Sequence, residues 1–175
     1  DMLSQTEHDV LARAIVVTTS RSLAEEIAAE TEKQLALLPR RETAEKSLAS
    51  SGGIILVDTL DEAVELVNTV APEHLELYTS DPDALLPKIK HAGAVFMGGW
   101  TPEPVGDYFA GPDHILPTSG SAKFFQVLNE DVFTRKMSVI RYTKEALNED
   151  GADIVRLAES EQRGAHANAV ASRLK

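Results

Sequence analysis

The sequence predicts an α/β fold, in which a mostly parallel sheet with flanking helices is followed by a helical C-terminal tail. Short apolar, β-branched runs alternate along the chain with stretches whose apolar residues recur at helical spacing, which is typical of repeated strand–helix units. The connections between these units are short, as expected where a helix crosses between parallel strands. With 175 residues and 43% hydrophobic content, the chain is large enough to bury a core.

The first half of the chain contains two such units. We expect a strand at Ala14–Thr19, and then a helix that Ser20 caps and that ends before Pro39, which cannot continue it. A second helix at residues 42–49 leads through two glycines into residues 54–57. This last run is apolar throughout, which favours a strand buried on both faces.

The second half begins regularly and then changes character. Thr59 caps a helix that ends before Pro72. We then expect, in order, a strand at residues 75–78, a helix at 82–89, a strand at 94–97, a loop at 98–120, a short helix at 123–128, a strand at 138–142 and helices over 144–174. The loop at 98–120 is rich in Pro and Gly and too long for an ordinary connection, which indicates a functional loop. We assign residues 1–142 to the α/β domain and residues 143–175 to the tail.

Composition restricts the chemistry that the chain can perform. It has no cysteine, so a metal would be held by His, carboxylate or amide groups. The formal charge of −11 argues against a nucleic-acid partner, because nucleic-acid surfaces bind clusters of Lys and Arg. No leader and no membrane-length apolar run is evident, so we expect a cytoplasmic protein with no membrane partner. Because the chain begins with Asp1, we expect it to be processed or part of something longer.

Titratable side chains gather at two stretches that contain Gly and Pro. Glu73 and His74 are neighbours, and neighbours in a strand point to opposite faces. We therefore expect this pair at a strand end, where such sheets place ligands. The alternative is a pair on an edge strand whose carboxylate and imidazole groups are solvated. Asp107 and His114 lie beside glycines in the long loop, where a ligand can approach closely. The alternative there is an Asx turn at Asp113 and an ordinary loop histidine.

Two further pairs lie near the ends of the chain. Gln5 and His8 are three residues apart in a segment of helical character, so they would share one face; the alternative is a surface pair without a role. Glu161 and His166 are five residues apart, and an ideal helix would rotate them about 140° from each other. Gly164 lies between them and can interrupt the helix so that both face one site. The alternative is a solvated amphipathic helix.

Taken together, these motifs resemble the histidinol dehydrogenase family, and specifically its C-terminal portion. The resemblance is carried, in order, by residues 3–8 (LSQTEH), 71–75 (APEHL), 93–96 (GAVF), 101–108 (TPEPVGDY), 114–120 (HILPTSG), 137–139 (MSV) and 166–170 (HANAV). It covers nearly the whole chain in the right order, and it is therefore specific.

The resemblance implies a set of site residues and a reaction. It implies Zn²⁺ held by Gln5, His8, Asp107 and His166, catalysis by Glu73 and His74, and substrate contacts from His114 and Glu161. The reaction would be oxidation of L-histidinol through an aldehyde to L-histidine with two NAD⁺, the closing step of histidine biosynthesis. His74 would take the proton as hydride leaves, and Glu73 would activate water for the second oxidation. The family resemblance also implies a homodimer in which the tail completes the partner's site.

No binding site for the nicotinamide cofactor is recognisable in this sequence. No Gly-x-Gly-x-x-Gly turn follows a strand, and family members are much longer, with the cofactor domain in their N-terminal part. We therefore expect an incomplete Rossmann-like domain whose NAD site lies largely outside this chain. Alone, the chain should bind zinc weakly and should not oxidise histidinol.

Two other hypotheses remain open. A non-catalytic dimerisation or metal-binding module would explain the missing cofactor domain, but it would not require Glu73 and His74. A zinc hydrolase would use Asp107, His8 and His166 as ligands with Glu73 as base, although no oxyanion stabiliser is evident in the sequence.

Overall fold

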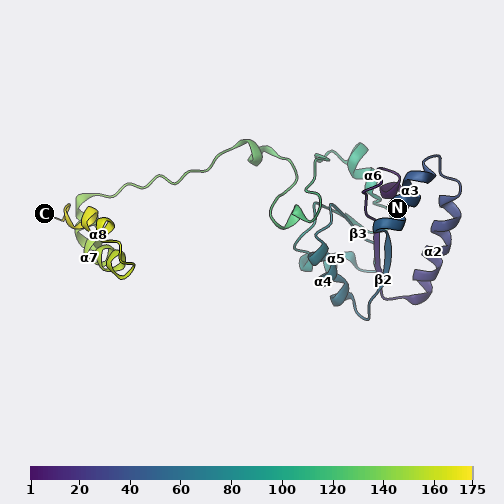
Figure 1. Cartoon of the computed structure of the whole chain (residues 1–175), viewed down its shortest axis with the longest axis horizontal. Coiled ribbons are helices and arrows are strands. Elements are labelled where there is room, and N and C mark those ends of the chain that lie inside the picture. Colours follow the sequence, from purple (N-terminus) through teal and green to yellow (C-terminus); the bar gives the residue numbers. More distant parts are fainter. Residues whose placement is uncertain (175) are drawn as a thin grey trace. The chain divides into compact units, whose positions relative to one another are not determined.

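The computed structural model describes residues 1–174, and the chain divides into two compact units, residues 1–133 and 134–175. In Figure 1 the first unit is coloured from purple to green, and the helices of the second are yellow-green to yellow. None of the helices within residues 1–174 has the length and apolar character needed to cross a membrane.

The first unit is an α/β structure, as predicted. It contains α1 (Met2–Thr6), β1 (Ile15–Thr18), α2 (Arg21–Leu35), α3 (Arg41–Ser51), β2 (Gly53–Leu56), α4 (Leu60–Val70), β3 (His74–Leu77), α5 (Pro82–Leu85), β4 (Ala94–Met97) and α6 (Glu103–Val105). β1 pairs with β2 and β3 with β4, both in parallel. These pairs form two separate two-stranded sheets instead of the one sheet that we expected.

Two helices of this unit begin at the side-chain caps that the sequence predicts. At the start of α2, the Ser20 hydroxyl accepts a hydrogen bond from the backbone N–H of Leu23 at 3.3 Å. At the start of α4, the Thr59 hydroxyl accepts one from the N–H of Glu62 at 3.2 Å. Each cap satisfies a backbone donor that the helix itself leaves unpaired.

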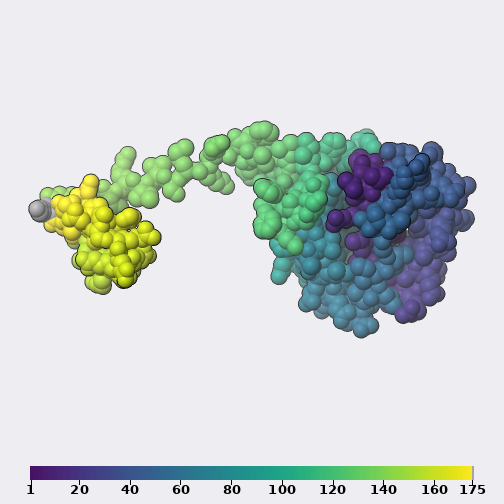
Figure 2. Space-filling model, in the orientation of Figure 1, coloured from purple at the N-terminus to yellow at the C-terminus, as the bar shows by residue number. Residues whose placement is uncertain are grey.

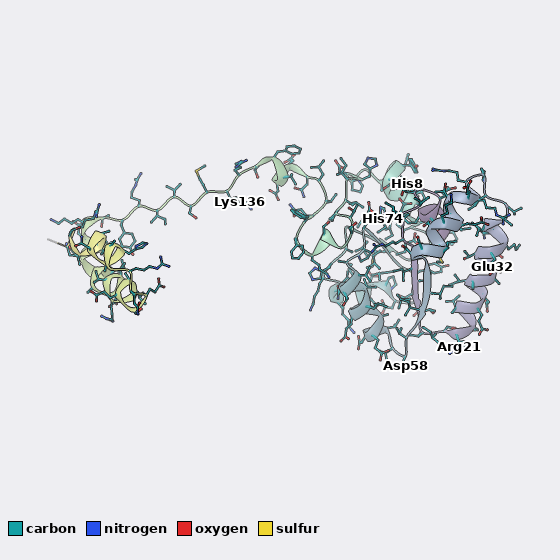
Figure 3. All side chains as sticks on the ribbon, viewed as in Figure 1. His8, Arg21, Glu32, Asp58, His74 and Lys136 are labelled. Atoms are coloured by element: carbon teal, nitrogen blue, oxygen red, sulfur yellow. The ribbon has the colours of Figure 1, made fainter. Side chains whose placement is uncertain are left out.

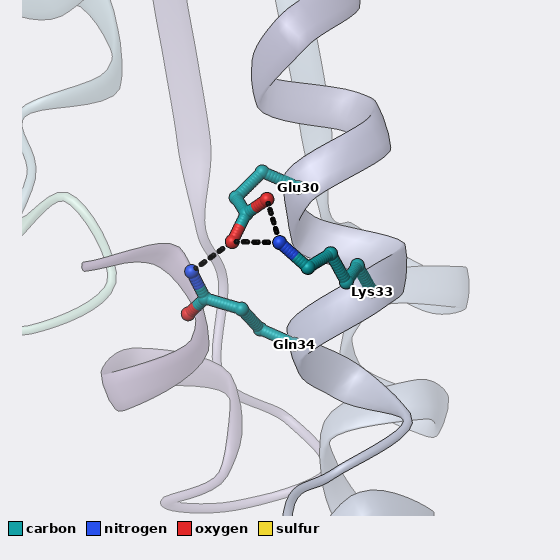
Figure 4. A network of polar contacts seen from close by, with 3 residues as sticks. All are labelled: Glu30, Lys33 and Gln34. Atoms are coloured by element: carbon teal, nitrogen blue, oxygen red, sulfur yellow. Dashed lines mark hydrogen bonds and ion pairs between the residues drawn. The ribbon is translucent and has the colours of Figure 1, made fainter.

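The solvent face of α2 carries a network of polar side chains (Figure 4). Glu30 accepts hydrogen bonds from Gln34 at 2.8 Å and from Lys33 at 3.1 Å. These bonds lower the pKa of the Glu30 carboxyl, with Gln34 as the larger cause. The residues are exposed, so the network contributes little to stability and indicates a surface that is solvated.

β3 and β4 separate the core of the unit from a second face. The buried cluster consists of Val64, Leu75, Leu77 and Leu85. Because side chains alternate along a strand, His74 and Glu76 point to the face opposite Leu75 and Leu77. The register places Glu76 beside Phe96 of β4. One face of β3 therefore builds the core, and the other is available for a site.

Two predictions about the strands are wrong. Residues 138–142 form no strand; Val139 and Ile140 are 84% and 85% exposed, and within residues 1–174 no partner strand pairs with them. An extended segment needs such a partner for its backbone hydrogen bonds. β2 is not buried on both faces, since Leu56 is 40% exposed.

Helices and turns also depart from expectation in places. The expected helix at 82–89 is α5 followed by a 3₁₀ turn, Leu86–Lys88, because Pro87 has no N–H to continue the α-helical pattern. The expected loop at 98–120 contains α6 and a π-helical segment, Gly106–Ala110. A 3₁₀ turn, Ser121–Lys123, takes the place of the helix expected at 123–128.

Ala71, at the end of α4, has a left-handed backbone conformation (φ 51°). The following Pro72 had suggested an extended conformation. The helix nevertheless ends where predicted, since a left-handed residue is a common terminator.

The second unit is a pair of helices, α7 (Lys144–Ser160) and α8 (Gly164–Ala171). The break between them includes Gln162, whose φ is 60°. It lies just before Gly164, the residue expected to interrupt the helix, which is instead the first residue of α8. Gly151 of α7 is buried against the side chain of Leu174. The tail is therefore helical as predicted, and it folds back on itself.

Candidate active site

The candidate site lies on the face of β3 and β4 that the core leaves free. Glu76 accepts the backbone N–H of Glu103 at 3.0 Å, and this bond ties the start of α6 to β3. Gly106 lies against the ring of Phe96, because a Cβ at that position would come within 2.7 Å of the ring atom Cε1. A residue without a side chain therefore lets α6 and the π-helical segment pack directly on the sheet.

His74 is held on this face by two neighbours. Its Nε2 atom lies 3.9 Å from Oε1 of Glu103, and the side chains are 15% and 18% exposed. The Phe96 ring is tilted by 54° to the imidazole, with the ring centres 5.9 Å apart. The imidazole is thus mostly buried, with an aromatic ring and a carboxyl group as neighbours.

Asp107 completes a cluster with His74 and Glu103. One ligand atom from each of the three lies within 4.8 Å of the others, and this is the one such group of His, Cys, Asp or Glu that could hold an ion in the described part of the chain. Burial raises the pKa of the Glu103 carboxyl, and the charge of Asp107 and a hydrogen bond between the two carboxyls raise it further. The imidazole of His74 opposes this rise. Carboxylate and imidazole groups suit Zn²⁺ and related ions.

Glu103 is a site residue that our sequence reasoning missed. It lies four residues before Asp107, and in helical backbone that spacing places two side chains on one face. This spacing within the motif at 101–108 was the available signal. The contact with His74 could not be read from it, because α6 and β3 are separate elements.

Glu73 lies immediately before β3, so Glu73 and His74 are at the amino end of the strand. This differs from the usual position of ligands in parallel sheets, outside the carboxyl ends. The Glu73 carbonyl accepts the N–H of Ala94 at 2.8 Å, and a Cβ at Gly93 would come within 2.6 Å of that carbonyl oxygen. The site forms at this end because α6 packs across the sheet face.

The loop that carries His114 passes the same end of the sheet. Pro117 is buried, and its Cδ would lie 3.2 Å from a Cβ at Gly93. Asp113 accepts the backbone N–H of Ile115 at 2.8 Å, which confirms the Asx turn considered for that residue. His114 itself is exposed.

Gln5 and His8 occupy different kinds of structure. Gln5 is in α1, whereas His8 lies beyond the end of that helix, in a turn where its N–H bonds to the Gln5 carbonyl at 3.2 Å. They are therefore not two positions on one helix face. The N-terminal segment lies at the surface of the first unit (Figure 2), and Arg40 donates to the His8 carbonyl at 3.3 Å. His8 and His74 lie toward the same end of the unit, away from Asp58 (Figure 3).

The other predicted pair lies in the second unit. Glu161 and His166 both line an open groove of about 520 Å³ between α7 and α8. Both are exposed, and Glu161 forms an ion pair with Arg163 at 3.1 Å. Within this unit, the break between α7 and α8 at residues 161–163 thus brings the pair onto one surface.

The chain is similar to known proteins over nearly all of its length. The family model described as histidinol dehydrogenase matches residues 1–174. The histidinol dehydrogenase of Halalkalibacterium halodurans is 54% identical over all of this chain and 41% of its own length. That of Bacillus subtilis is 51% identical over 99% of this chain and 40% of its own length. The crystal structure of histidinol dehydrogenase from Elizabethkingia anophelis superposes with a TM-score of 0.83 at 35% identity, over 99% of this chain and 40% of that one. The chain spans about two fifths of the length of these relatives.

Proposed function

Because the chain belongs to the histidinol dehydrogenase family, we propose that it forms the C-terminal part of an NAD-dependent enzyme that oxidises L-histidinol through histidinal to L-histidine. The observation that carries this proposal is the mostly buried His74 imidazole on the free face of β3 and β4, 3.9 Å from Glu103 and clustered with Asp107. Oxidation of an alcohol by hydride transfer needs a group that accepts the hydroxyl proton, and a metal ion nearby can orient the substrate. Such a biosynthetic enzyme would work in the cytoplasm.

The proposed metal is Zn²⁺, with Gln5, His8, Asp107 and His166 as its ligands. One carboxylate with an amide and two imidazoles is a suitable donor set for this ion, and it leaves the ion with net positive charge. When bound, the ion supplies a Lewis acid that holds and orients the imidazole and amine of the substrate. Of these four residues, Asp107 lies in a cluster that could hold a metal, although its partners there are His74 and Glu103 and not the other proposed ligands.

His74 and Glu73 carry out the proton transfers in this proposal. In the first oxidation, the substrate hydroxyl gives its proton to His74 as hydride leaves carbon for the first NAD⁺. In the second, Glu73 takes a proton from water, the oxygen adds to the aldehyde, and hydride leaves for the second NAD⁺. His74 is mostly buried, which limits the access of water to the imidazole while it exchanges a proton with the substrate.

The remaining functions are divided between this chain and the rest of the enzyme. We place the NAD site in the part of the relatives' length that this chain does not span, since no glycine-rich dinucleotide turn is evident here. His114 and Glu161 contact the substrate in this proposal. The enzyme is a homodimer in which Glu161 and His166 of one subunit complete the site of the other.

Two activity measurements test the proposal. Purified chain with Zn²⁺, L-histidinol and NAD⁺ should form no NADH at an enzymatic rate, and turnover would overturn our placement of the NAD site. In the complete enzyme, Glu73→Gln should lower overall histidine formation by about 10²- to 10⁴-fold, the usual loss on removing a general base. Glu65→Gln, at an exposed position on α4, is the control.

The mass of the dimer separates this function from an assembly role. Glu73→Gln should leave the dimer intact, because the carboxylate serves chemistry alone in this proposal. Loss of the dimer with the substitution would instead favour a non-catalytic dimerisation module.

A further inference from the structure

We propose that Glu103 is a positioning residue that orients the imidazole of His74 through Nε2 and leaves Nδ1 to exchange the proton with the substrate. The inference rests on the function proposed above, in which His74 is the proton acceptor. It adds a residue to that function, because the motif at 101–108 assigns a role to Asp107 and none to Glu103.

The first support is the geometry of the pair. Oε1 of Glu103 lies 3.9 Å from Nε2 of His74, and both side chains are mostly buried. This distance is within reach of an ion pair but longer than a direct hydrogen bond. The attraction is therefore strongest once His74 has accepted a proton, which is the charge that develops during the first oxidation.

The second support is that Glu103 is itself held in place. Glu76, two residues after His74 on the same face of β3, accepts the backbone N–H of Glu103 at 3.0 Å. Gly106 allows the following turn to lie against Phe96, and the Phe96 ring centre lies 5.9 Å from that of the imidazole. The carboxyl group and the aromatic ring together limit rotation of the imidazole.

An orienting carboxylate has a defined consequence for a histidine base. Even without a direct hydrogen bond, negative charge near one ring nitrogen favours the tautomer with hydrogen on that nitrogen, because the N–H dipole then points toward the charge. The lone pair is then on the other nitrogen. With Glu103 beside Nε2, the lone pair lies on Nδ1. Without the carboxylate, the ring would populate both tautomers, and a smaller fraction of the enzyme would be ready to accept the proton.

The main competing role for Glu103 is metal binding, because its carboxyl lies in the cluster with Asp107. Kinetics of the complete enzyme distinguish the two roles through Glu103→Ala, Glu103→Gln and the surface control Glu65→Gln. We expect Glu103→Ala to lower kcat by about 10- to 100-fold, as is usual for partners that orient an active-site histidine. Glu103→Gln keeps an acceptor oxygen and should lose less, while KM for L-histidinol and zinc per subunit stay unchanged in both variants.

A spectroscopic measurement tests the orientation directly. In the ¹⁵N-labelled chain, His74 is assigned by comparison with His74→Gln, and the shifts of its two nitrogens report the tautomer. We expect hydrogen on Nε2 in the parent and a mixture of tautomers in Glu103→Ala. Unchanged kcat, an unchanged tautomer, or loss of zinc in parallel with kcat would each overturn the proposal.

Discussion

Gly106→Ala perturbs the contact between Gly106 and Phe96, through which α6 packs on the sheet. The new Cβ would lie 2.7 Å from Cε1 and 3.0 Å from Cζ of Phe96, where carbon atoms need about 3.5 Å or more. Phe96 is 6% exposed and cannot swing away. Overpacking of this kind costs about 1–3 kcal/mol, and the better helix propensity of Ala returns up to about 1 kcal/mol. We expect a net loss of roughly 1–2 kcal/mol.

Hydrogen exchange in the β3–β4 pair measures this loss locally. The N–H groups of Ala94 and Gly98 bond across the pair, and a loss of roughly 1–2 kcal/mol should make them exchange about 5- to 30-fold faster. Gly99→Ala is the matched control: its Cβ would also meet a ring, that of Tyr78, but this ring is 77% exposed and can move. Equal exchange in the parent and both variants would refute the inferred packing of α6 on Phe96.

Two further predictions concern a pH dependence and a helix cap. The pKa of Glu103 is raised in the folded protein. The stabilisation that this shift provides is therefore fully present below the ordinary pKa of 4.5 and is lost as the pH rises through the folded-state pKa. The Gln side chain does not titrate, so the free energy of unfolding of Glu103→Gln minus that of the parent should increase from acid to neutral pH. Urea unfolding at several pH values measures this difference, and a difference independent of pH would contradict the prediction. Ser20→Ala removes the acceptor of the Leu23 N–H and should cost about 1 kcal/mol, seen as faster exchange in the first turn of α2. Ser20→Thr should retain the protection, and equal exchange in all three chains would count against the cap.

Local sequence signals were sufficient for most of the secondary structure. The strand expected at residues 94–97 is β4, with the same bounds, and the caps at Ser20 and Thr59 are the ones observed. These features depend on neighbours within a few residues, which the sequence shows directly. The strand expected at residues 138–142 did not form, because pairing depends on another strand that a local pattern cannot supply.

The candidate site, too, was predictable from the sequence only in part. The order of motifs along the chain was enough to identify the family and to select His74 and Asp107 as candidates for chemistry. Only the folded structure placed Glu103 beside His74, because their contact joins α6 to β3 across 28 intervening positions and depends on Glu76 and Gly106. Spacing along the chain identifies residue types that are able to do chemistry. Which of them meet is decided by packing between elements, since that packing alone sets the distance and burial of each side chain.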